Sequence, residues 1–315
     1  MTEPALYGHD LFGAPIKPKP LGPVAERFTI PPFSILDARS GAWRERKAAW
    51  LSLGIRSEVG RDAKAITGKS DYPDRYDYMP KMATDVSVFD PLLCELAYRW
   101  FCPTGGQIVD PFSGGSVRGI VAGSLGRRYW GCDLRPEQVA ANEQQADDIE
   151  PTVRPVWVCG DSMDTLTTAP EADMVFSCPP YGDLEKYSTD PRDLSAMDWH
   201  AFVAAYKRIV LRCVQVMKND TFACFVVGDF RDGRGFYRNF VSTTIDAFEE
   251  CGARLYNEAI LATPAGMAAM SITRQFKSGR KLAKTHQNVL VFCKGDWKAA
   301  TAKCEGHNAA LTRRP

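Results

Sequence analysis

The feature that most constrains this chain is a regular alternation of apolar strands and amphipathic helices between about residues 88 and 295. Each short apolar run is followed by a helical pattern of roughly ten or more residues. Parallel neighbouring strands need crossover helices of this length, whereas antiparallel hairpins do not. The pattern predicts an α/β fold with a mainly parallel sheet, whose strands we expect at 106–112, 127–134, 156–161, 172–176, 221–230, 254–264 and 287–295.

The remaining segments differ in composition from this main domain, residues 83–297. Residues 1–26 are rich in proline and glycine, and we expect a flexible arm without a fold. Residues 27–82 are expected to form an extension with one helix at 42–53, followed by a polar, tyrosine-rich loop. Residues 298–315 are expected to be a C-terminal tail.

Several classes of protein are disfavoured by composition. The chain has no apolar run of about 18 residues and no secretory leader pattern, so we expect a cytoplasmic protein without a membrane partner. Its ten cysteines are scattered and form no C-x-x-C pair. We therefore expect free thiols, with neither disulfides nor a metal site.

The distribution of charge is more informative than the net charge of +1. Residues 259–295 contain no acidic residue, and the Gly and Ser content of this stretch predicts a basic loop at about 262–285. Such a positive field suits a phosphate backbone, and the alternative is an ordinary solvated loop. The candidate DNA-contacting residues are Arg274, Lys277, Arg280, Lys281 and Lys284.

A glycine turn and two acidic residues follow consecutive predicted strands. The stretch "IVDPFSGGSVRG", residues 108–119, reads as a strand, a glycine turn and a helix start, which suits a nucleotide-like cofactor. It has neither the G-x-G-x-x-G spacing nor a P-loop lysine. Asp133 ends the next strand, where an acid can bind ribose hydroxyls, and Asp161 ends the third, where it can bind an adenine amine.

The stretch "SCPPY", residues 177–181, stops the fourth predicted strand. Pro179 and Pro180 lack an N–H and fix φ, so the strand cannot continue through them. Tyr181 then stands on a stiff loop at the carboxyl end of a strand, which is where ligands bind in open α/β sheets. This motif, together with the turn and the two acids, predicts one site.

These motifs resemble the amino-directed DNA methyltransferases that use S-adenosylmethionine. "DPFSGG" resembles their cofactor loop, "GCDLRPEQVAANEQ" the segment with the ribose-binding acid, and "SCPPY" their [DNS]-P-P-[YFW] catalytic motif. "FDPLL", "VVGDFRDGRGFY" and "KTHQNVLVFCKG" resemble further family segments. The resemblance covers about residues 80–296 and is to phage and bacterial members, including those of restriction-modification systems.

The resemblance implies a Rossmann-like methyltransferase fold, with a mainly parallel seven-stranded sheet and helices on both faces. It implies S-adenosylmethionine as cofactor, DNA with a flipped target base as partner, and transfer to the exocyclic amine of cytosine (N4) or adenine (N6). The implied catalytic residues are Cys178, Pro179, Pro180 and Tyr181. The implied cofactor-binding residues are Phe89, Asp110, Pro111, Phe112, Ser113, Gly114, Gly115, Asp133, Asp161 and Ser162.

Two departures from the family pattern leave alternatives open. Gly114-Gly115-Ser116 replaces the usual G-x-G, which alters the expected path of the loop. Cys178 replaces the Asp, Asn or Ser that accepts an amine hydrogen, and a thiol is a poor acceptor. The carbonyl of Pro179 would carry more of this role, helped by Ser177 or Asp183. The alternatives are a weak or inactive DNA-binding accessory protein, and a C5-pyrimidine or RNA methyltransferase that uses Cys178.

Overall fold

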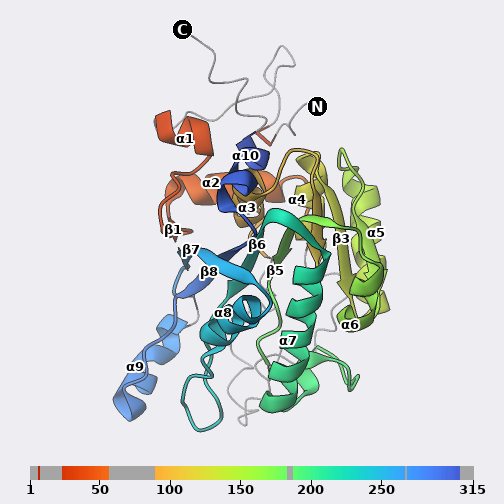
Figure 1. Ribbon diagram of the computed structural model, residues 1–315. Coiled ribbons are helices and arrows are strands. Elements are labelled where there is room, and N and C mark those ends of the chain that lie inside the picture. Colours follow the sequence, from red (N-terminus) through yellow and green to blue (C-terminus); the bar gives the residue numbers. More distant parts are fainter. Residues whose placement is uncertain (1–5, 8–22, 57–88, 183–186, 267, 306–315) are drawn as a thin grey trace.

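A single mixed sheet forms the centre of the molecule, as a computed structural model of the chain shows (Figure 1). The structure describes residues 6–7, 23–56, 89–182, 187–266 and 268–305. The order of the strands is β1-β7-β8-β6-β5-β2-β3-β4, and β8 alone runs antiparallel to its neighbours. The strands are β1 (Ile35–Asp37), β2 (Gln107–Asp110), β3 (Arg128–Asp133), β4 (Val156–Cys159), β5 (Ala172–Ser177), β6 (Met217–Val227), β7 (Ala253–Ala262) and β8 (His286–Lys294).

The prediction of a mainly parallel α/β sheet is confirmed, with an eighth strand added at one edge. Strand β1 pairs in parallel with β7, so that Ile35 lies opposite Ile260. It has only three residues and follows a Pro-Pro pair. A run this short shows no period of its own, which is why the sequence pattern did not reveal it.

Helices cover both faces of the sheet, and the strand residues alternate between two cores. Ile108 of β2 and Met174 of β5 belong to a core that includes residues of α2, α3, α4 and α5. Their neighbours Val109 and Val175 belong to the opposite core, with residues of α7 and α8. This two-sided burial explains why β2 and β5 are continuous apolar runs. The helices are α1 (Pro23–Phe28), α2 (Gly41–Leu51), α3 (Pro91–Phe101), α4 (Val117–Ser124), α5 (Pro136–Ile149), α6 (Ser162–Thr165), α7 (Trp199–Val216), α8 (Phe240–Glu250), α9 (Ala268–Gly279) and α10 (Trp297–Glu305).

Three short helices lie where the sequence predicted none. Helix α9 occupies much of the expected basic loop at 262–285, and α10 begins within the domain and runs into the expected tail. Helix α1 overlaps the end of the expected arm. Ala, Met, Gln, Arg and Lys favour a helix in α9, and this local propensity outweighs the scattered Gly and Ser. The expected tyrosine-rich loop falls mostly outside the described residues, and no described helix is both long and apolar enough to span a bilayer.

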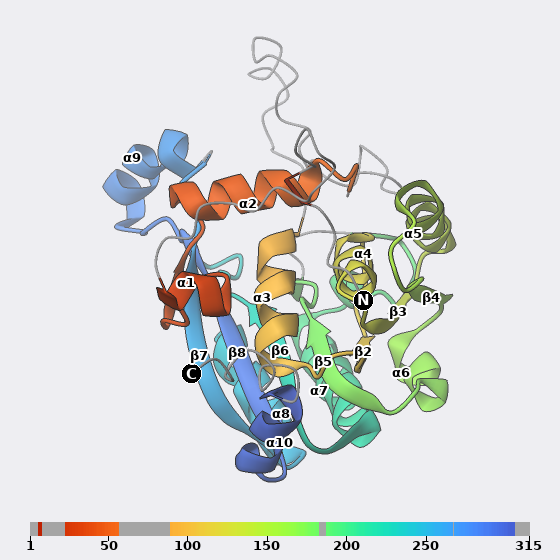
Figure 2. The same ribbon diagram turned by 90° about the horizontal axis from the view of Figure 1, so that it is seen from above.

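A buried carboxylate attaches the N-terminal extension to the main domain. Helix α2 lies across α3 (Figure 2). Arg46 of α2 donates to both oxygens of the fully buried Glu95, at 2.8 and 2.5 Å. Trp50 Nε1 donates to Glu95 Oε2 at 2.7 Å, and Arg99 Nε to Oε1 at 2.8 Å. Each acceptor oxygen is thus satisfied by groups from two helices, and the extension is part of the folded domain.

Replacing Glu95 with glutamine should lower the free energy of unfolding by about 2–3 kcal/mol, because two arginines lose the buried charge that pairs with them. The loss is moderated because the side chains of Arg46 and Arg99 remain 16% and 25% exposed. Urea denaturation followed by tryptophan fluorescence measures the change. Glu45→Gln, on the exposed side of α2, is the matched control and should shift stability by less than about 0.5 kcal/mol. Equal effects of the two changes would contradict the proposed anchor.

Candidate active site

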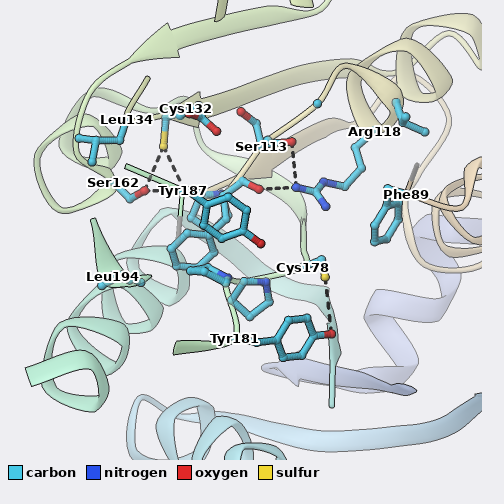
Figure 3. Close-up of a pocket in the computed structure, with 18 of the residues that line it drawn as sticks. Phe89, Ser113, Arg118, Cys132, Leu134, Ser162, Cys178, Tyr181, Tyr187 and Leu194 are labelled. Carbon is cyan, nitrogen blue, oxygen red and sulfur yellow. Dashed lines mark hydrogen bonds between the residues drawn. The ribbon is translucent and has the colours of Figure 1, made fainter. Parts of the chain in front are cut away.

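The main cavity lies at the carboxyl ends of β2, β3, β4 and β5 and has a volume of about 400 Å³ (Figure 3). Strand β2 lies between β3 and β5, so the chain proceeds to one side of β2 first and to the other side afterwards. The loops after β2 and β5 therefore diverge and leave a crevice between them, as at the switch point of other open α/β sheets. Gly114 and Tyr181, which follow these two strands, both line the cavity.

The loop after β2 approaches the cavity through its backbone. Gly114 has φ of 50°, in the left-handed region that glycine adopts readily. Its carbonyl accepts a hydrogen bond of 2.7 Å from Asn142 Nδ2, which fixes the turn against α5. On the other side, a Cβ on Gly131 would lie 2.8 Å from Ser113 Cβ, so only glycine lets β3 pass so close. The double glycine thus forms a defined turn, despite its departure from the usual spacing.

Asp110 organises the loop without lining the cavity, which corrects the expectation that it contacts the cofactor. It is fully buried, and its oxygens accept hydrogen bonds from Arg118 Nε (2.6 Å), Tyr129 (2.8 Å) and Ser177 (2.6 Å). Arg118 also donates to the carbonyls of Phe112 and Ser113. Arg118 lines the cavity in place of Asp110 (Figure 3). Asp110 therefore links α4, β3 and the ends of β2 and β5.

Asp133 and Asp161 both line the cavity and both have local partners. Asp133 accepts a hydrogen bond from the backbone N–H of Arg135 (2.9 Å) and lies 3.4 Å from its Nε. Asp161 caps helix α6 by accepting from Met163 N at 2.8 Å. Ser162, next to it, donates its hydroxyl to the carbonyl of Pro111. The two acids are thus held at the ends of neighbouring strands, with their positions fixed before any ligand binds.

The loop after β5 places Cys178, Pro179, Pro180 and Tyr181 on the cavity wall. Tyr181 accepts a 2.7 Å hydrogen bond from Gln287 Nε2, and its oxygen lies 3.9 Å from Cys178 Sγ. Burial raises the pKa of the Tyr181 phenol well above its ordinary value, so the hydroxyl stays protonated at neutral pH. The tyrosine ring is therefore oriented by a residue of β8, more than a hundred residues away.

The expectation that Ser177 assists the neighbouring carbonyl is wrong. Its side chain is fully buried and donates its hydroxyl to Asp110, away from the cavity lining. The reason is strand alternation: Ser177 is still part of β5, whereas Cys178 is the first residue beyond it. Asp183, the other expected helper, lies outside the described residues.

The wall opposite Asp133 comes from the N-terminal extension and the start of α3, where sequence reasoning had placed only Phe89. The Arg118 guanidinium lies 4.8 Å from the centre of the Phe89 ring. Lys47 of α2 forms an ion pair of 3.2 Å with Asp90, and both line the cavity. Trp43 Nε1 donates to Asp90 at 3.0 Å, so this carboxylate is fixed. No sequence motif marks Lys47, because it enters the site only through the packing of α2 on α3.

The predicted DNA-contacting residues are divided by the structure. Arg274, Lys277, Arg280 and Lys281 are exposed, and α9 extends away from the body of the molecule (Figures 1 and 2). Lys284 is different: a Cβ on Gly228 would lie 3.4 Å from Lys284 Cε and 3.7 Å from Tyr181 Cε1. Partial burial lowers the pKa of this ammonium. Of the five, Lys284 alone packs beside a residue of the cavity wall.

The strand order, with β8 as the antiparallel strand, defines the fold as Rossmann-like and as the methyltransferase variant that the sequence resemblance implies. No family model matches the chain, and no curated protein matches its sequence.

Solved structures with some similarity are methyltransferases by their titles, except for TrmN, whose title names no activity. TrmN from Thermus thermophilus has 13% identity and a TM-score of 0.44, over 65% of this chain and 48% of TrmN. Magnesium protoporphyrin IX methyltransferase from Synechocystis has 10% identity and a TM-score of 0.42, over 65% and 79% of the two chains. A TehB-like methyltransferase from Corynebacterium glutamicum has 17% and 0.41, over 66% and 89%. The chain spans about half the length of TrmN. Likenesses at this level carry no argument about activity or substrate.

Proposed function

We propose that the protein is an S-adenosylmethionine-dependent DNA methyltransferase that acts on the exocyclic amine of cytosine (N4) or adenine (N6). One observation carries the proposal: the glycine loop, the acids Asp133 and Asp161, and the Cys178–Tyr181 motif line a single cavity at the switch point of the sheet. A cofactor loop and a base-binding loop must face each other for methyl transfer, and these two do.

The residues present fit the proposed cofactor. Ser113 Oγ is buried at the cavity wall and has no hydrogen-bond partner within the described part of the chain, so it has capacity for a ligand. Asp133 and Asp161 supply acceptors suited to ribose hydroxyls and an adenine amine. Lys47 and Asp90 supply opposite charges suited to an amino-acid group. When bound, the cofactor would supply an electrophilic methyl group on sulfur.

The chain's own groups would orient the acceptor amine. The carbonyl of Pro179 would accept one of its hydrogens and aim the nitrogen lone pair, with Cys178 beside the second hydrogen as a weaker acceptor. The Tyr181 ring would stack on the extruded base, and Gln287 holds that ring in place. Because the reaction needs mainly positioning, the weak acceptor at 178 lowers the rate without abolishing transfer.

Incubation with radiolabelled S-adenosylmethionine and DNA, followed by digestion to nucleosides and mass spectrometry, tests the proposal. N4-methylcytosine or N6-methyladenine supports it. A C5-methylpyrimidine, with activity lost in Cys178→Ala, would instead identify Cys178 as a nucleophile. Label in RNA alone would change the substrate. Cofactor binding without transfer to any nucleic acid would favour an inactive accessory protein.

The ion pair at the cavity wall leads to a prediction about cofactor affinity. Lys47→Gln should weaken binding of S-adenosylhomocysteine about 5- to 10-fold, because the amino-acid carboxylate loses a partly exposed cation. Binding of methylthioadenosine, which has no carboxylate, should not change. Isothermal titration calorimetry measures both affinities.

The matched control is Lys207→Gln on α7, because the Lys207 side chain is 34% exposed and that of Lys47 is 35% exposed. Lys207 pairs with Glu250, away from the cavity. The control should change neither affinity. If Lys47→Gln weakened both ligands equally, its role would be to shape the wall and not to bind a carboxylate.

A further inference from the structure

The loop between β6 and α8, residues 229–238, has a conformation set by its own hydrogen bonds. Asp232 accepts from the backbone N–H groups of Arg234 (3.0 Å) and Phe236 (2.9 Å). Asp232 N also donates to the Phe236 carbonyl at 2.8 Å, and Arg231 forms a bridge with Tyr237. Arg231 Nη1 donates to the Gly235 carbonyl at 2.8 Å. The tip of the loop is therefore ordered before any partner binds.

This ordered loop exposes two aromatic rings. Phe236 is 70% exposed and Tyr237 is 42% exposed. The Arg231 guanidinium lies 4.0 Å from the centre of the Tyr237 ring and holds it in place. Exposing a phenylalanine on a fixed turn costs free energy in water unless a partner covers it. An aromatic ring in such a position suits stacking on a flat, apolar surface.

Cations surround the aromatic tip. Residues 229–238 and 280–284 contain six basic residues and two acidic ones. Both acids are engaged: Asp232 with the loop backbone and Arg234, and Asp229 with the N–H of Val241 at 3.1 Å. The Arg234 side chain is 86% exposed. The surface is therefore positive around Phe236, which disfavours a basic or purely apolar partner and suits a polyanion.

The same surface is continuous with the cavity wall. Lys284 Nζ lies 6.0 Å from the centre of the Tyr237 ring, and Lys284 also packs beside Tyr181 over Gly228. Lys281 contacts the loop directly, since a Cβ on Gly235 would lie 2.7 Å from its Nζ. The residues from Tyr181 through Lys284 to Phe236 thus form one path, from the proposed base pocket to the exposed ring.

We propose that this surface binds the nucleic-acid strand next to the target nucleotide. Phe236 stacks on one unstacked flanking base, while Arg234, Lys281 and Lys284 contact the phosphates on either side. Aromatic rings among cations bind single-stranded segments in this way, without reading sequence. The proposal rests on the proposed function, because the flanking base lies beside a target base held by Tyr181. It also moves the main contact from α9 to the loop after β6.

Phe236→Ala should weaken binding of a fluorescent single-stranded oligonucleotide about 5- to 100-fold, as measured by anisotropy in the presence of S-adenosylhomocysteine. Phe236→Trp should restore the affinity, since stacking needs only an aromatic face. Phe33→Ala is the matched control: Phe33 is 69% exposed and lines a separate groove beside α3. Arg234→Ala should reduce the dependence of log K on log salt by about 0.7.

The controls separate this proposal from the proposed function. Affinity for S-adenosylhomocysteine and the thermal midpoint should be the same in the wild type, Phe236→Ala and Phe33→Ala. If the wild type binds and methylates DNA while Phe236→Ala behaves as Phe33→Ala does, the flanking-base site is wrong and the proposed function stands. If the wild type binds S-adenosylhomocysteine but no nucleic acid, both are overturned.

Discussion

Replacing Asp110 with alanine should lower the free energy of unfolding by about 3–5 kcal/mol, because the buried Arg118 charge loses its partner. The ion pair is 2.6 Å long, and the side chains of Arg118 and Asp110 are 6% and 0% exposed. Tyr129 and Ser177 lose a hydrogen-bond acceptor as well. Urea denaturation measures the change, and affinity for S-adenosylhomocysteine should fall with it, since Arg118 holds the carbonyls of the glycine loop.

The matched control for Asp110→Ala is Asp147→Ala. Asp147 forms an ion pair of 2.5 Å with Arg154, but both side chains are more than half exposed. The two pairs are nearly equal in length and differ in burial, so solvent screening predicts a change of less than about 1 kcal/mol for the exposed pair. A double variant, Asp110→Asn with Arg118→Met, should recover part of the loss. Similar losses for Asp110→Ala and Asp147→Ala would contradict the role of Asp110 as the organising group.

Replacing Tyr181 with alanine should lower kcat/KM for methyl transfer to DNA about 100-fold, while affinity for S-adenosylhomocysteine changes little. The change removes the proposed stacking surface, and the target amine loses its alignment with the methyl group. Single-turnover transfer of radiolabel measures the rate, and calorimetry measures the affinity.

Tyr181→Phe is the informative companion. It keeps the ring, whose edges pack against Phe230 and Phe240, and removes only the acceptor for Gln287. We expect its rate to stay within about tenfold of the wild type, because one neutral hydrogen bond contributes about 1 kcal/mol. If Tyr181→Phe were as slow as Tyr181→Ala, the hydroxyl and not the stacking ring would be the important group.

The residues of the candidate site were found from sequence where a local signal marks them. Gly114, Asp133, Asp161 and Tyr181 each follow a recognisable strand, and parallel strands end at a common edge, so their convergence follows from the strand pattern alone. Lys47 carries no such signal. Its side chain reaches the cavity because Arg46, its neighbour on α2, binds Glu95 on α3.

The orientation of individual side chains was also beyond the sequence. Asp110 and Ser177 belong to motifs that suggest ligand contact, but they bind each other across β2 and β5. Alternation along a strand fixes which face a residue takes, and the exact residue at which the strand ends decides the alternation. Strand ends are the least certain feature of a sequence pattern.

The sequence by itself determined the class of fold, the edge of the sheet that carries the site, and most of the residues there. These follow from local causes: apolar periodicity, the φ freedom of glycine, and the lack of an N–H in proline. Only the tertiary structure decided that Asp110 supports the loop, that α2 closes the cavity with Lys47, and that Phe236 projects beside Lys281. Contacts between segments far apart in the chain depend on packing geometry, for which the sequence has no local signature.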